Sequence, residues 1–133
     1  MKNILAYLCL FSMTSVALAE QIVIDNKTNY PEINSPGKIA VQWGASAEAT
    51  QKANKTIING STLDPSSLMM LSQNGQITLA TPNHAHYFRL VVWSTNKQDP
   101  DLLTNWVDIV PNKTYIVNQN QLVPAILMSG SGC

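Results

Sequence analysis

The sequence predicts an all-β fold, a small antiparallel β-sandwich with an immunoglobulin-like or jelly-roll-like topology. Short apolar runs recur along the chain, and turn residues such as Asn, Asp, Gly and Pro separate them. No long helix-forming segments alternate with these runs. A pattern of about eight short strands with turn signals between them is typical of antiparallel sandwiches and small barrels.

The first two strands are predicted at residues 21–24 and 38–43. The first run stops at residues 25–29, where Asp and Asn favour a turn. The second run alternates as a half-buried strand requires, because one face carries only apolar side chains, namely Ile39, Val41 and Trp43.

The next segment leaves two structures open. Residues 45–53 are good helix formers without an apolar stripe, so a short surface helix and a loop are equally compatible with them. Residues 56–58 predict a short strand that ends at the turn dipeptide Asn59-Gly60.

A β-hairpin is predicted around Asn74-Gly75. Apolar runs at 68–71 and 76–79 flank this dipeptide, which accepts the positive φ values of a tight turn. The two runs are therefore expected to pair with each other.

The run at 85–95 is the longest and most apolar, so we expect it at the centre of a sheet. Both of its faces are mostly apolar, which predicts cover on both sides and requires a partner for Arg89. Residues 99–103 are expected to form a connecting turn or a single helical turn. Further strands are expected at 106–110, 114–119 and 122–128, and residues 129–133 are expected to form a flexible tail.

Residues 1–19 have the features of a cleavable secretory signal peptide. Lys2 is followed by an apolar run at residues 4–11, and Ala17-Leu18-Ala19 places small residues where a signal peptidase reads them. The apolar run is shorter than the ~20 residues that a membrane span needs. The sequence thus predicts a signal peptide, a single domain at residues 20–128 without a transmembrane segment, and a secreted or periplasmic location.

Charge and cysteine content exclude two classes of protein. Without Lys2 the mature chain holds seven basic and eight acidic residues, scattered along its length, which argues against nucleic acid as a partner. Cys9 lies in the signal peptide, so Cys133 has no internal partner and the domain is not a disulfide scaffold. Cys133 could instead link two copies in an oxidising compartment. Few cysteines and many asparagines favour a bacterial exported protein.

His84 and His86 are the candidate metal ligands. Residues two apart in a strand point to the same side, so both imidazoles could bind one Cu or Zn ion. The alternative is that both histidines are ordinary exposed side chains at the start of a strand and bind no metal. No cofactor motif, P-loop, dinucleotide fingerprint or Gly-x-Ser-x-Gly motif occurs in the sequence.

Trp43, Trp106 and Asn105 are the candidate ligand-binding residues, because they lie beside predicted loops rich in amide and hydroxyl side chains. Exposed Trp rings provide contact area for sugars, peptides or lipid headgroups. The alternative is core packing, which we expect for Trp93.

The layout of the tryptophans resembles that of the aegerolysin family, small β-sandwich proteins that bind membrane lipids. The similar features are an Asn-rich turn after the first strand, a strand that ends at Trp43-Gly44, and Trp93-Ser94 and Trp106 around a polar loop. The resemblance implies lipid as one class of ligand, includes no diagnostic motif, and does not extend to the export signal.

These observations predict an exported, non-enzymatic binding or interaction module that contacts a protein, glycan or lipid through loops. An exported Cu- or Zn-binding protein that uses His84 and His86 is the alternative, and a small hydrolase is the third candidate.

Overall fold

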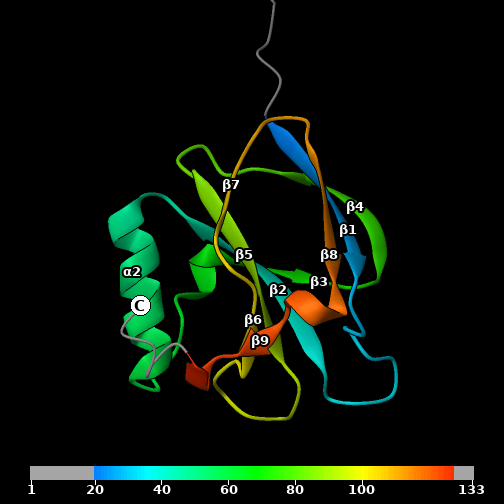
Figure 1. The fold of residues 1–133 in the computed structure, drawn as a ribbon, viewed down its shortest axis with the longest axis vertical. Coiled ribbons are helices and arrows are strands. Elements are labelled where there is room, and N and C mark those ends of the chain that lie inside the picture. The colour runs from blue at the N-terminus through cyan, green and yellow to red at the C-terminus, as the bar shows by residue number, and fades with distance from the viewer. Residues whose placement is uncertain (1–19, 128–133) are drawn as a thin grey trace, which may run out of the picture.

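A computed structural model describes residues 20–127, and it is mostly β-strand in two sheets with the short helix α2 beside them (Figure 1). The broadly all-β prediction is therefore confirmed. The predicted signal peptide and the C-terminal tail with Cys133 lie outside the described residues. The elements in chain order are β1 (Gln21–Lys27), β2 (Lys38–Gly44), α2 (Ala47–Ile58), the 3-10 turn η1 (Pro65–Ser67), β3 (Leu68–Leu71), β4 (Gly75–Ala80), β5 (Tyr87–Trp93), β6 (Leu102–Leu103), β7 (Val107–Asp108), β8 (Thr114–Asn118), the 3-10 turn η2 (Gln119–Gln121) and β9 (Val123–Pro124).

The smaller sheet has the strand order β4-β1-β8, and the larger has the order β3-β2-β5-β6-β9 with β7 also paired to β5. All pairs are antiparallel except β1 with β8, which is parallel. This pair departs from the predicted antiparallel pattern. It is sterically allowed because a long stretch of chain, rather than a tight turn, connects the two strands.

The two sheets share one hydrophobic core. Buried side chains alternate along β1, where Ile22 and Ile24 point inward, and along β8, where Tyr115 and Val117 do so. Leu79 of β4 adds to the side of the smaller sheet, and the inner face of the larger sheet supplies Ile39, Val41, Leu71, Phe88, Leu90 and Val92.

The outer face of the larger sheet is covered by α2 and the segment that follows it (Figure 1). Ala40 and Val91 on this face form a second cluster with Ile57 of α2 and with Leu63. Strand β5 is consequently buried on both faces and lies between β2 and β6. The prediction of a central, doubly covered strand is confirmed.

The segment that left a helix and a loop open forms the helix α2 (Ala47–Ile58), and the predicted strand at 56–58 is wrong. Ser46 caps the helix by accepting a hydrogen bond from the Ala49 backbone N–H, and the helix continues to Ile58. The β-branched residues of its last turn are tolerated because Ile57 is buried against the sheet, and this burial outweighs their weak helix propensity.

The predicted hairpin at 68–79 is also wrong. Strand β3 pairs with β2 and strand β4 pairs with β1, so the turn at Asn74-Gly75 carries the chain from one sheet to the other. Gly75 has the expected positive φ of 88°. The Asn74 side chain donates hydrogen bonds to the carbonyl oxygens of Thr28 (2.9 Å) and Tyr30 (2.6 Å), which anchors this turn to a distant loop.

The C-terminal strands β7, β8 and β9 occur where they were predicted but are shorter. Within residues 20–127, no helix is long and apolar enough to cross a membrane.

Candidate functional site

Arg89 is the most unusual side chain in the described part of the protein. It lies on β5, has none of its surface exposed, and points toward α2. Its Nε donates a hydrogen bond of 2.7 Å to Oε1 of Gln42, its cross-strand neighbour on β2, and its Nη1 donates one of 2.7 Å to Oδ1 of Asn54 on α2. Both partners are neutral amides, so neither neutralises the guanidinium charge.

Trp106 covers Arg89 on the same face of the sheet. The Arg89 guanidinium carbon lies 4.3 Å from the centre of the Trp106 ring, and Trp106 Nε1 donates a hydrogen bond of 3.2 Å to Asn54. The ring can approach this closely because residue 44 is glycine. A Cβ there would lie 3.1 Å from the ring and 2.8 Å from Thr50 Cγ2.

The guanidinium remains charged at neutral pH despite its burial. Desolvation lowers the pKa of Arg89 to about 10, because an apolar environment disfavours the charged form. Nη2 is buried and has no hydrogen-bond partner among the described residues. Residues 20–127 thus hold a buried, hydrogen-bonded but unneutralised positive charge.

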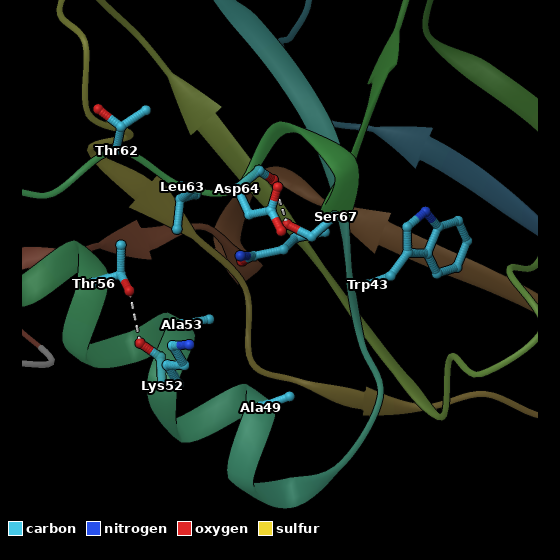
Figure 2. Close-up of a pocket in the computed structure, with 10 residues that line it drawn as sticks. Trp43, Ala49, Lys52, Ala53, Thr56, Thr62, Leu63, Asp64 and Ser67 are labelled. Carbon is cyan, nitrogen blue, oxygen red and sulfur yellow. Dashed lines mark hydrogen bonds between the residues drawn. The ribbon is translucent and has the colours of Figure 1, made fainter.

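A hollow of about 340 Å³ lies beside this cluster, between α2, the end of β2 and the segment around η1 (Figure 2). Its walls combine small apolar side chains with amide, hydroxyl and charged groups. The lining residues are Gln42, Trp43, Ala49, Lys52, Ala53, Thr56, Thr62, Leu63, Asp64 and Ser67.

Gln42 joins Arg89 to the hollow. Its side chain is buried, with 2 % of the residue exposed, and it lines the hollow. Arginine has donors only, so the oxygen of the Gln42 amide must face Arg89. The Nε2 amino group, which makes no hydrogen bond within the described residues, is the end left for a ligand in the hollow. The inner wall of the hollow therefore presents oriented N–H donors.

The rim of the hollow carries opposite charges. Asp64 accepts a hydrogen bond of 3.0 Å from the Ser66 backbone N–H, which holds the pKa of its carboxyl below the ordinary value, and the charge of Lys52 lowers it further. The Thr62 hydroxyl accepts a hydrogen bond of 2.6 Å from Gln98. The hollow can thus contact a ligand through donors, a hydroxyl, and an apolar wall at Leu63.

Trp43 and Trp106 do not form one binding surface. Trp43 borders the hollow, but in Figure 2 its ring lies on the other side of β2 from Ala49 and Lys52. It packs at a centroid distance of 6.4 Å against Phe88, a core residue. The two predicted ligand-binding tryptophans therefore lie on opposite faces of the larger sheet, and both are half-buried.

Asn105 is exposed and lines a separate hollow of about 510 Å³ between β8 and the segments around β7 and β9. The structure does not bring it together with Trp43. Trp93 is half-buried and packs against the cluster beneath α2, and its Nε1 donates a hydrogen bond to the Gln98 carbonyl.

His84 and His86 are both exposed and lie before the start of β5. Within residues 20–127, no group of three His, Cys, Asp or Glu side chains is placed to hold a metal ion. The backbone of His86 instead connects strands, because its N–H bonds to the Gly44 carbonyl and its carbonyl accepts from Ile109.

Sequence reasoning identified Arg89 as a residue in need of a partner but missed Gln42 and Asn54. The sequence contains one indication of the pair. Gln42 is a polar residue on the second face of the predicted strand at 38–43, and Arg89 is a charged residue in another apolar strand. Recognising it required the register of β2 against β5, in which Gln42 lies directly opposite Arg89.

Comparison with known proteins finds no protein-family model, no curated protein and no solved structure that matches this chain.

Proposed function

We propose that this protein is an exported, non-enzymatic binding module of the periplasm or extracellular space. In this proposal the two sheets form a β-sandwich that acts as a rigid support, and the hollow between α2, β2 and η1 is the binding site. The ligand is a small polar molecule or the exposed polar end of a glycan.

The observation that carries the proposal is the orientation of Gln42. The Nε2 group of this largely buried amide has no hydrogen-bond partner among the described residues, and it is not one of the fully buried unpaired atoms, so it is open to solvent in the hollow. A ligand that offers an acceptor oxygen to Gln42 Nε2 replaces water at a donor whose position is already fixed. The donor is held in place by Arg89, so little ordering is needed on binding.

The size and lining of the hollow support a small ligand. A volume of about 340 Å³ is at the lower end of the range for small-molecule sites. Leu63 and two alanines of α2, Ala49 and Ala53, offer apolar contact, whereas Thr62 and Asp64 offer groups that bond to hydroxyls. Hydroxyl-bearing rings combine these two kinds of surface.

The test is an NMR titration of the protein that begins at Glu20. Mixtures of monosaccharides, amino acids and small phosphorylated compounds are added while the side-chain amide of Gln42 is observed. We expect saturable shifts of this amide with at least one mixture and unchanged ligand signals over time. Shifts confined to residues outside the hollow, or none at all, would contradict the proposal.

Ala53→Leu tests the location of the site, because it fills the hollow with a good helix former. It should abolish the shifts of Gln42. Gln51→Leu, which adds an apolar side chain to the exposed side of the same helix, serves as the control and should leave binding unchanged.

A further inference from the structure

The charge behind the hollow indicates which polar ligands it prefers. Arg89 is buried and charged, and within residues 20–127 no carboxylate makes an ion pair with it. An isolated buried charge is costly unless an opposite charge approaches it. The described protein does not supply that charge, whereas a ligand in the hollow can.

Gln42 transmits the charge of Arg89 to the hollow. The guanidinium donates to Oε1 at 2.7 Å and so polarises the amide, which makes the N–H groups of Nε2 stronger donors. An anionic oxygen gains more from such donors than a neutral one, because hydrogen bonds to charged groups are about twice as strong.

The rim does not cancel this preference. Lys52 contributes a second positive charge, and Asp64 one negative charge, to the lining of the hollow. Asp64 is fully exposed to solvent and directs one carboxylate oxygen to the backbone of Ser66. Solvent screens its repulsion more strongly than it screens the buried guanidinium.

We propose that the hollow binds the oxyanion group, a carboxylate or a phosphate, of a small organic ligand, with Gln42 Nε2 and Lys52 Nζ as its donors. This inference rests on the proposed function. The role of Arg89 is positioning and electrostatic, since it acts on the ligand through Gln42.

The experiment compares three probes that share one ring, namely glucose, glucuronate and glucose 6-phosphate, by NMR titration. Both anionic probes should bind at least about tenfold more tightly than glucose, which corresponds to one charge-assisted hydrogen bond. The tighter of the two identifies the oxyanion as a carboxylate or a phosphate.

Gln42→Glu is the decisive variant. The new carboxylate keeps an acceptor for Arg89 but removes the N–H donors and neutralises the guanidinium charge. Followed through the backbone amides of Ala53 and Leu63, which line the hollow, this variant should show no advantage of glucuronate and glucose 6-phosphate over glucose. Gln73→Glu adds the same charge at an exposed position that does not line this hollow, and should retain the advantage.

The outcomes separate the two proposals. Equal affinity for all three probes at Gln42 would overturn the oxyanion inference and leave the binding site in place. If none of the three probes shifts Gln42 but an uncharged monosaccharide in the mixtures does, the oxyanion inference is again overturned, whereas a shift by an amino acid or a phosphorylated compound that Gln42→Glu abolishes supports it. If no compound shifts Gln42, both proposals fail. A thermal melt of Gln42→Glu shows whether the variant is folded, so that a loss of binding can be distinguished from a loss of structure.

Discussion

Arg89 Nε donates a hydrogen bond of 2.7 Å to Gln42 Oε1, and this contact determines which end of a buried amide faces the hollow beside α2. The two residues lie directly opposite each other on β5 and β2, so their side chains share the face of the sheet that α2 covers. The same pair of residues therefore contributes both to the stability of the fold and to the candidate binding site.

Arg89→Lys should lower the free energy of unfolding by about 1–3 kcal/mol. A lysine keeps the charge but cannot reproduce the planar arrangement that bonds Gln42 and Asn54 while stacking on Trp106. Urea unfolding measures the change, and Lys55→Arg on the exposed side of α2 is the control. Equal denaturation midpoints for Arg89→Lys and the wild type would contradict this account of the site.

Trp43→Ala and Trp106→Ala should both destabilise the domain, by about 2–4 kcal/mol, because each ring is half-buried and packed against a buried side chain. This differs from the behaviour of an exposed aromatic surface, which the sequence led us to expect. Thermal melts of both variants decide the question. If either substitution leaves the melting temperature unchanged, the ring of that tryptophan does not contribute to packing and is available at the surface to bind a ligand.

Gly44→Ala should destabilise by about 1–3 kcal/mol, since the new methyl group would meet both Thr50 and the Trp106 ring. Thr50→Ser removes the Cγ2 atom that lies closest to it, so the double variant should recover part of the loss. A double-mutant cycle by urea unfolding measures this coupling. If the effects of Gly44→Ala and Thr50→Ser on the free energy of unfolding are additive, contact between the new methyl group and Thr50 is not the cause of the destabilisation.

Asn74→Ala should cost about 1–3 kcal/mol of stability, because its amide satisfies the carbonyl oxygens of Thr28 and Tyr30. Asn96→Ala, at an exposed position, is the matched control and should change stability little. Chemical denaturation compares them. If the two substitutions prove equivalent, the Asn74 contacts do not hold the crossing between the sheets.

When the full chain is expressed in a bacterium, the exported protein should begin at or within two residues of Glu20, because Ala17-Leu18-Ala19 has the form of a signal-peptidase site. Intact-mass measurement of protein from the periplasm and medium tests this. Ala19→Arg should block processing and supplies the negative control. Retention of residues 1–19 on the wild-type protein would remove the basis for the proposed location.

The sequence by itself determined the strands whose signal is local. Alternation at residues 38–43 and the continuous apolar run that contains β5 depend only on which side chains can be buried, and both strands occur as predicted. The same reasoning identified Arg89 as a charge inside a buried strand. It also correctly placed a turn with positive φ at Gly75.

Only the tertiary structure decided how these strands pair and what Arg89 bonds to. A turn dipeptide predicts a change of direction, but the partners of β3 and β4 depend on burial against distant strands and on anchors such as Asn74. The strand predicted at residues 56–58 became helix because Ile57 packs against the sheet. The orientation of Gln42 likewise arises from an arginine 47 residues away in the chain. Hydrogen bonds between distant segments depend on the three-dimensional register, which no local pattern encodes.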